Sequence, residues 1–174
     1  MVLVFALFAC LKAPVPVQSG NARQLVVANV MDSTTDVSAT GTPAAFDVAV
    51  VGAAGRRKLV TLLVEGGPAF DTFTAVRDTS RRITALKEES RDTPLLLVET
   101  APVFFSELNG QYRWTVAVHV SLVAADGTFN EARFDVPVFL QYHHQREAEA
   151  VDAASPVVER RVGEVIDTWL SGGG

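Results

Sequence analysis

The residues that could do acid–base or metal chemistry are few in this 174-residue sequence, and they are scattered along it. The three histidines are His119, His143 and His144. Neighbouring residues on a strand point to opposite faces, so the adjacent pair cannot bind one ion with both rings. If a hairpin turn is centred on Asp126-Gly127, His119 pairs near residue 134, and His143 then lies far along the strand from it. The spacing therefore predicts no metal site, and nothing else in the sequence indicates a cofactor.

The sequence also lacks a recognisable set of residues for hydrolysis. It requires a nucleophile, a base and a group that orients the base. No serine stands in a Gly-x-Ser-x-Gly elbow, and Glu99 and Glu107 are isolated carboxylates in or beside an apolar run. We therefore expect a protein that is not an enzyme.

A glycine-rich segment, residues 52–57, is the one candidate for a phosphate-binding loop. Backbone amides in such loops bind anions, and Arg56 and Arg57 would add positive charge. The segment lacks the Gly-Lys-Ser/Thr ending of a P-loop and the third glycine of a dinucleotide fingerprint. We interpret it as a turn between two strands. The net charge of −5 also gives no reason to expect a nucleic-acid partner.

The N-terminus begins with an apolar run, residues 1–9, that ends at the single cysteine, Cys10. Nine residues are too few to span a bilayer, which takes about 20, but they match the apolar core of a signal peptide. Leu7-Phe8-Ala9-Cys10 resembles the lipobox of bacterial lipoproteins. This resemblance implies that Cys10 becomes the lipidated N-terminus. The alternative is a buried N-terminal strand with Cys10 as a small core residue.

Behind this segment we expect a tether and one folded domain. Residues 10–22 are rich in Pro, Ser, Gly and Gln, as in a flexible linker. Residues 23–171 are then a single α+β domain.

A hairpin over residues 112–142 is the clearest structural signal. Two runs alternate with period two, each with one apolar face, and Asp126-Gly127 supplies the turn between them. Pro137 cannot donate a ladder hydrogen bond, which predicts an edge position or a bulge. Phe139 breaks the pattern, because it lies on the polar face. A partner or another part of the chain should therefore cover that face.

The remaining elements complete an α+β fold. We expect strands over residues 25–30, 46–51, 59–64 and 95–105, with an Asn109-Gly110 turn before the hairpin. Helices are expected from Pro68 to about Glu89, and from Ser155-Pro156 to the C-terminus, where Gly163 would let the helix approach a strand. The resulting fold class is an antiparallel or mixed sheet of five to six strands with two helices packed on one face. Binding residues on the uncovered face would be Arg113, His119, Phe139 and Gln141.

The order of these elements after a lipobox is similar to that of small outer-membrane lipoproteins, such as the LPS-assembly lipoprotein and the accessory lipoproteins of envelope transport machines. The resemblance implies a lipid-anchored protein on the periplasmic side of a membrane, with a protein partner in the cell envelope. The alternative is a soluble periplasmic domain that binds a small ligand in a cavity lined by Trp114, Trp169, Phe104 and Tyr142.

Lipidation of Cys10 makes a direct prediction. In a bacterial host, the membrane fraction should contain a mature chain that starts at Cys10 and carries acyl mass. Cys10→Ser should remove both the acyl mass and the membrane association, because no thiol remains to be modified. Intact-mass spectrometry of the two fractions measures this. A full-length, unmodified wild-type chain in the soluble fraction would rule out the anchor.

Overall fold

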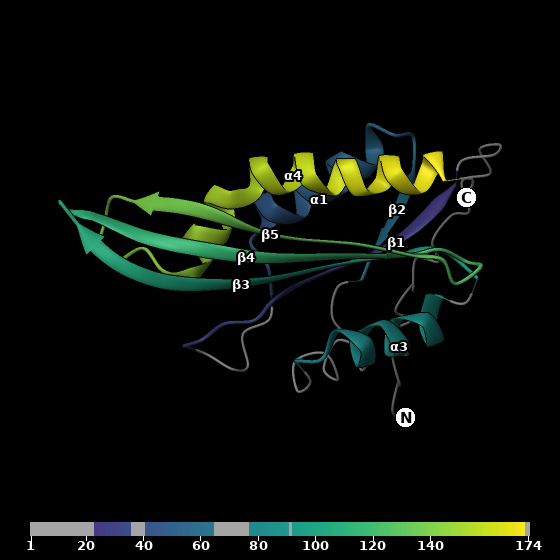
Figure 1. Ribbon diagram of the computed structural model, residues 1–174, viewed down its shortest axis with the longest axis horizontal. Coiled ribbons are helices and arrows are strands. Elements are labelled where there is room, and N and C mark those ends of the chain that lie inside the picture. Colours follow the sequence, from purple (N-terminus) through teal and green to yellow (C-terminus); the bar gives the residue numbers. More distant parts are fainter. Residues whose placement is uncertain (1–22, 36–40, 65–76, 91, 173–174) are drawn as a thin grey trace, which may run out of the picture.

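A computed structural model describes residues 23–35, 41–64, 77–90 and 92–172. Five strands form one mixed sheet in the order β2-β1-β3-β4-β5 (Figure 1). The strands are β1 (Gln24–Met31), β2 (Val60–Leu63), β3 (Leu95–Leu108), β4 (Gln111–Val123) and β5 (Phe129–Leu140). The helices are α1 (Ala44–Gly55), α3 (Thr79–Ser90) and α4 (Glu147–Ser171). Cys10, residues 1–9 and the 10–22 tether lie outside the described residues.

The predicted meander is confirmed. β3, β4 and β5 pair antiparallel in sequence order, while β1 pairs parallel with both β2 and β3, so the sheet is mixed. Both residues of the Asn109-Gly110 turn have positive φ, 54° and 74°, as the tight hairpin turn requires. Gly127 has φ 88° in the β4–β5 turn. The predicted edge position of Pro137 is also confirmed, because β5 is the last strand of the sheet.

Of the two strands predicted over residues 46–51 and 59–64, the first is wrong and the second is confirmed. β2 forms where a strand was expected, but residues 46–51 belong to helix α1, and the glycine-rich segment after them mostly continues that helix. The buried positions Phe46, Ala49, Val50, Ala53 and Ala54 recur at helical spacing. Asp47 is the only polar residue in the run, so the sequence fits a strand with period two as well as a helix with period 3.6.

Helix α4 starts eight residues before the predicted Ser155-Pro156 start, with Pro156 inside it. Its true start is marked by a cap in which the Glu149 carboxylate accepts the Arg146 backbone N–H at 2.8 Å. Pro156 removes one helical hydrogen bond, and packing offsets this loss. Val151, Ala154, Val158 and Val162 on either side of it are fully buried.

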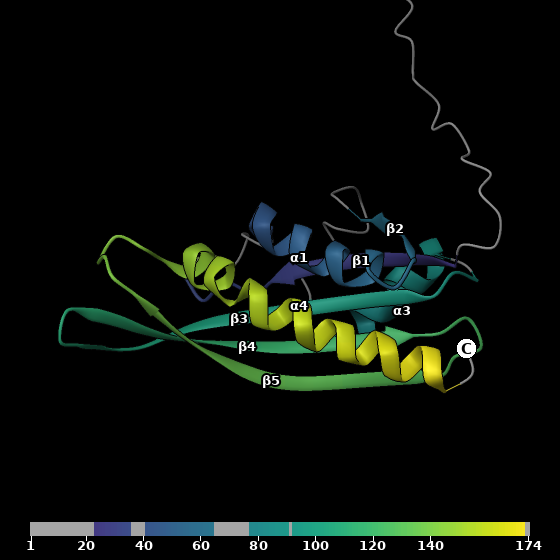
Figure 2. The same cartoon turned by 90° about the horizontal axis from the view of Figure 1, so that it is seen from above.

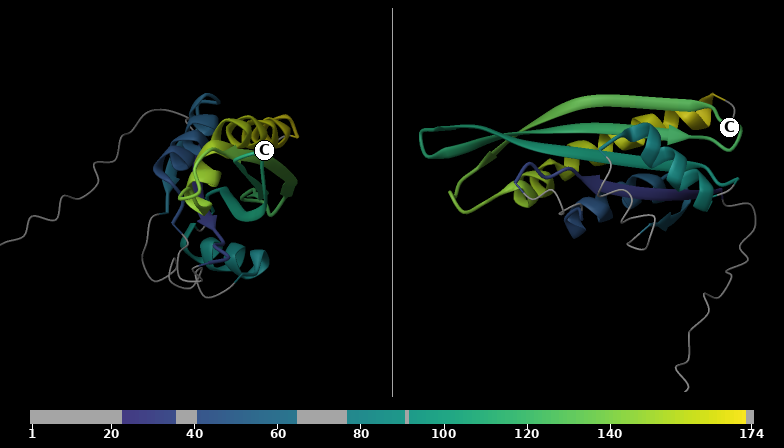
Figure 3. Two further views of the ribbon diagram at one scale, coloured as in Figure 1. Left: turned by 90° about the vertical axis from the view of Figure 1, so that its left-hand side faces the viewer. Right: turned by 90° about the horizontal axis from the view of Figure 1, so that it is seen from below.

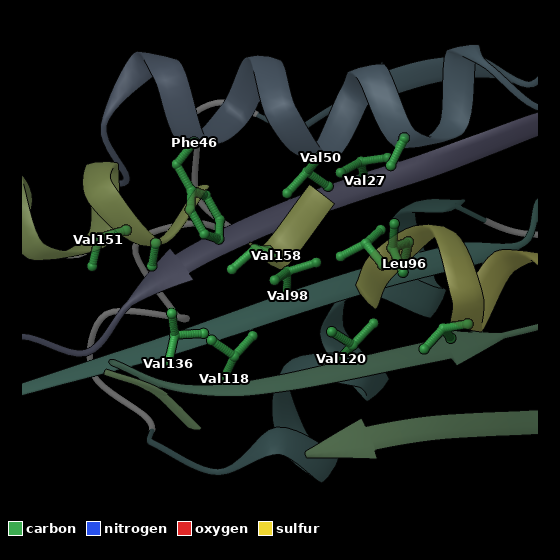
Figure 4. Close-up of a cluster of buried hydrophobic side chains, with 14 of the residues drawn as sticks. Val27, Phe46, Val50, Leu96, Val98, Val118, Val120, Val136, Val151 and Val158 are labelled. Carbon is green, nitrogen blue, oxygen red and sulfur yellow. The ribbon is translucent and has the colours of Figure 1, made fainter. Parts of the chain in front are cut away.

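The helices lie on both faces of the sheet, which corrects the prediction of two helices on one face. Figure 3 shows α1 and α4 on one side and α3 on the other. The main core lies between the sheet and α1 with α4, and its alternating valines appear in Figure 4. A smaller core joins α3 to the opposite face through Ile83, Leu86, Leu95 and Leu97. The predicted helix from Pro68 is observed only from Thr79, and residues 65–76 lie outside the described part.

Gly163 has a different neighbour from the predicted strand. The guanidinium of Arg57, which follows the end of α1, occupies the space beside Gly163. A Cβ added at Gly163 would lie only 2.6 Å from the nearest guanidinium nitrogen. From there Arg57 donates two hydrogen bonds to Asp167, at 2.6 and 2.5 Å. This forked ion pair raises the pKa of Arg57 and lowers that of Asp167. The glycine therefore makes room for a link between α1 and α4.

Glu147 ties the start of α4 to the segment that follows β1. Its carboxylate accepts the Ser33 hydroxyl, the Thr34 N–H at 2.9 Å and the Thr34 hydroxyl at 2.5 Å. Burial alone would raise the pKa of Glu147, but these hydrogen bonds favour the charged form and hold the pKa below its ordinary value. The ionised carboxylate therefore stabilises the folded state.

The Glu147 network predicts acid sensitivity of defined sign. A depressed folded-state pKa contributes stability that is complete above the unfolded value, about 4.3, and is lost as pH falls through the folded value. Glu147→Gln should lower the free energy of unfolding by about 1.5–3 kcal/mol at pH 7, the usual value of hydrogen bonds to a charged group. The difference from wild type should shrink below about pH 4. Urea unfolding over a pH series measures it.

Glu107→Gln, at an exposed carboxylate, is the matched control and should show little pH-dependent difference. A Glu147→Gln deficit that stays constant from pH 7 to pH 3 would contradict this role.

Candidate functional site

The candidate site is the face of the sheet on which α3 lies, called here the α3 face. Helix α3 packs on β1 and β3 residues, among them Val26, Leu95 and Leu97. Strands β3 and β4 continue well beyond it and project past the ends of α1, α3 and α4 (Figures 1 and 2). The α3 face therefore has a covered half, which is charged, and a half beyond α3, which is apolar.

A buried ion cluster fills the covered half. Arg82 on α3 is only 1% exposed, and it pairs with Asp32 at 2.6 Å and with Glu99 at 2.5 Å. Burial alone would lower the pKa of Arg82, but the hydrogen bonds that it donates to both carboxylates hold this pKa above its ordinary value. The cluster fixes α3 to β3 and to the end of β1.

His119, a predicted binding residue, lies at the margin of this cluster. Its Nδ1 is 3.3 Å from the Glu99 carboxylate and its Nε2 is 3.2 Å from that of Glu131. The Thr79 hydroxyl donates to Glu99 at 2.6 Å. His119 thus bridges two carboxylates, one buried and one half exposed.

A pocket of about 380 Å³ opens beside His119. Its lining carries charges of both signs, from Arg77, Arg133, Glu99 and Asp135, together with the apolar residues Ala101 and Ala117. Such a lining suits a small polar molecule that carries both charges.

The half beyond α3 carries an apolar surface, called here the hairpin-tip patch. It consists of Val103, Phe105, Leu108 and Phe139 around Arg113, and the four apolar side chains are 49–69% exposed. The β3–β4 register shifts at Phe105, so this residue is a bulge that adds a side chain to the face. The Arg113 guanidinium lies 5.2 Å from the Phe105 ring centre and 5.9 Å from that of Phe139. The cation therefore holds both rings in place.

The aromatic cavity proposed for a small ligand does not assemble. Trp114 and Trp169 are buried in the main core, while Phe104 and Tyr142 are half exposed. Phe104 packs edge-on against Trp114, with ring centres 5.4 Å apart. Trp169 instead borders a groove of about 470 Å³ formed with Pro94 and Ala124.

Of the predicted binding residues, the structure brings Arg113 and Phe139 together and places His119 apart from them, under α3. Gln141 is exposed just beyond β5, and Cys10 lies outside the described residues. Sequence reasoning missed Phe105 and Arg82. The adjacent pair Phe104-Phe105 in an alternating strand signals a bulge, because both cannot follow period two. Nothing in the sequence distinguishes Arg82 from the exposed Arg81 beside it.

The described residues contain neither a metal-binding cluster nor a membrane-spanning helix. No group of three or more His, Cys, Asp or Glu side chains there is placed to hold a metal ion. None of the helices in those ranges is long and apolar enough to cross a membrane.

Comparison with known proteins gives no family. No protein-family model and no curated protein matches the chain. Among solved structures it is similar to lipoprotein GNA1162 from Neisseria meningitidis, at TM-score 0.45 and 12% identity over 83% of this chain and 99% of that one. Protein XCC0632 from Xanthomonas campestris is similar at TM-score 0.46 and 14% identity, over 92% of this chain and 94% of that one. A minor lipoprotein from Acinetobacter baumannii is similar at TM-score 0.39 and 12% identity, over 80% of this chain and 90% of that one. Similarities this low do not assign the chain to a family.

The ion cluster predicts a large effect of one substitution. Arg82→Ala should lower the free energy of unfolding by about 3–5 kcal/mol, because it leaves Asp32 and Glu99 without their buried partner. The exposed neighbour provides the control, since Arg81→Ala should change stability by less than about 0.5 kcal/mol. Chemical denaturation of both variants measures the difference. Equal, small losses would show that the cluster does not hold α3 to the sheet.

Proposed function

We propose that this chain is a lipid-anchored protein of the cell envelope that binds a protein partner through the hairpin-tip patch and performs no catalysis. The anchor would be the lipid on Cys10, with residues 10–22 as the tether. The folded domain would then lie on the periplasmic side of a membrane.

The observation that carries the proposal is the exposure of two phenylalanines, 69% for Phe105 and 55% for Phe139. Phe105 lies on the β3–β4 hairpin, which projects beyond the helices (Figure 2), and Phe139 pairs with Arg113 of that hairpin from β5. Contiguous exposed apolar surface is costly in a soluble domain and marks interaction sites. Burying a phenylalanine side chain contributes about 1.5–3 kcal/mol. A partner that covered both rings would gain much of that free energy.

The composition of the patch fits a protein partner. Aromatic residues and arginine are enriched where protein–protein binding energy concentrates. Arg113 keeps both rings oriented before binding, which lowers the entropy lost on association. The charge of Arg113 would also favour a partner surface that carries a carboxylate beside its apolar contact.

The polar groups of the α3 face support a structural role rather than chemistry. Glu99 is held by Arg82, Thr79 and His119, and His119 is held between Glu99 and Glu131. No hydroxyl nucleophile in this network is bonded to His119 at less than 3.3 Å. A base that is engaged on both ring nitrogens has no free position for a substrate proton.

A second candidate function is binding of a small polar ligand. It is favoured by the charged pocket of about 380 Å³ beside His119. Variants of Arg133, which lines this pocket and lies outside the hairpin-tip patch, separate it from the first proposal.

The partner-binding proposal is tested by photo-crosslinking in intact cells. A photoreactive phenylalanine analogue at position 105 should give one discrete protein adduct in the membrane fraction. Arg113→Glu should abolish the adduct, because it releases both rings and reverses the charge of the patch. Arg133→Ala should leave it unchanged.

Val48, which is 71% exposed on α1, is the matched control position for an apolar side chain outside the patch. The same adduct at position 48, or an adduct that persists in Arg113→Glu, would contradict the proposal. Loss of a bound small molecule from native mass spectra of Arg133→Ala, with no adduct at 105, would favour the second candidate.

A further inference from the structure

The outer edge of β5 offers a row of backbone groups whose direction can be derived. The Ala124 N–H donates to the Thr128 carbonyl at 2.8 Å, so this pair is hydrogen-bonded across the turn. Hydrogen-bonded and non-bonded pairs alternate along an antiparallel ladder. Even-numbered residues of β5 therefore bond to β4, and odd-numbered residues direct their N–H and C=O groups outward. Among the described residues, no strand pairs with this edge (Figure 2).

Pro137 fits this parity. Because Pro137 is odd-numbered, its missing N–H would have pointed outward. The β4–β5 ladder therefore loses no hydrogen bond. Its effect is to remove one donor from the free edge. Any strand that adds here meets a full set of donors from Phe129 to Asp135 and a gap at 137.

The side chains along this edge have an order that is complementary to itself. The odd-numbered residues lie on the α3 face and are exposed: Phe129, Glu131, Arg133, Asp135, Pro137 and Phe139. Read in the reverse direction, the series places a negative residue opposite the positive one and a phenylalanine opposite a phenylalanine. A strand with the same sequence, running antiparallel, is therefore a candidate occupant.

We propose that two copies of this chain associate through β5, with a two-fold axis at Phe134, so that their sheets become continuous. In this register Arg133 of each copy lies opposite Asp135 of the other. Phe129 of one copy lies opposite Phe139 of the other, at the margin of the hairpin-tip patch. Each bonded pair exchanges two hydrogen bonds, except the pairs that contain Pro137, which exchange one. The interface is isologous, as two-fold dimers require.

Charge favours this register over the two adjacent ones, which are centred on Arg133 and on Asp135. Centring the axis on Arg133 would place Arg133 opposite itself and Glu131 opposite Asp135, so every charged pair would repel. Centring it on Asp135 would oppose the two Asp135 carboxylates. Opposite charges directly across a strand pair stabilise it and like charges destabilise it. Only the Phe134-centred register among these three joins unlike charges.

The opposite face of the sheet leaves space for the added strand. A groove of about 320 Å³ runs along the edge between the Asn130–Phe134 segment of β5 and residues Arg161, Glu164 and Thr168 of α4. Helix α4 therefore does not close over the edge. Phe134 borders this groove, with the Arg161 guanidinium 5.9 Å from its ring centre. At the axis, the two Phe134 rings would meet beside it.

The test is sedimentation velocity of the full chain in detergent micelles over a concentration series. Wild type should form a dimer. Arg133→Asp and Asp135→Arg should each weaken the dimer about tenfold or more, because each turns two attractive pairs into two repulsive ones. The double variant Arg133→Asp/Asp135→Arg should restore wild-type association. Arg81→Asp, the same charge change at an exposed site on α3, should have no effect.

Register is tested by disulfide formation in a Cys10→Ser background. Phe134→Cys places two thiols across the axis in a non-bonded pair, within disulfide reach. Ala132→Cys, two residues away, places them roughly 13 Å apart at strand rise and should not cross-link. A wild-type chain that stays monomeric, single charge variants that dimerise like wild type, or a double variant that fails to recover would overturn the proposal. So would equal cross-linking at 132 and 134.

Discussion

The strict alternation of side chains along β4 is the constraint on which the rest of the structure depends. Residues 114, 116, 118, 120 and 122 face α1 and α4 and form the centre of the main core. Residues 113, 115, 117, 119 and 121 face the other way. A shift of one residue would expose the core valines and bury Arg113 and His119. The register of β4 therefore determines both what is buried and what is presented.

The two faces of the sheet consequently differ in character. One is closed by α1 and α4 over an apolar core, and the forked Arg57–Asp167 ion pair links these helices. The other is closed only in part, by α3 and the Arg82 cluster. Since α3 ends its cover near Glu99, the projecting half of β3 and β4 keeps its apolar side chains in solvent. The same arrangement that stabilises the domain therefore leaves the hairpin-tip patch exposed.

The sequence predicted the elements whose periodicity was unambiguous. The meander, its two turns and the edge position of Pro137 followed from period two, glycine placement and the missing proline N–H. Helix α1 was missed because Asp47 is the only polar residue among residues 46–51, and one polar position cannot distinguish period two from period 3.6. The start of α4 was missed because Pro156 is a strong helix-start signal, and here packing against the sheet overrides it.

The site was predicted only in part, for a similar reason. Phe139 was predicted because it is an apolar residue on the polar face of the hairpin. Arg113 was predicted because it lies on that same face. Phe105 required the β3–β4 register, since only the bulge brings it to that face. The burial of Arg82 could be seen only in the tertiary structure, because it depends on where α3 packs on the sheet.

Amide hydrogen exchange along β5, measured residue by residue in dilute solution, tests this account most directly. The account predicts slow exchange at the even-numbered residues 130–138, which bond to β4, and fast exchange at 131, 133 and 135, which point outward. The opposite alternation, or none, would mean that the register is shifted. The hairpin-tip patch would then not be the surface that this domain presents.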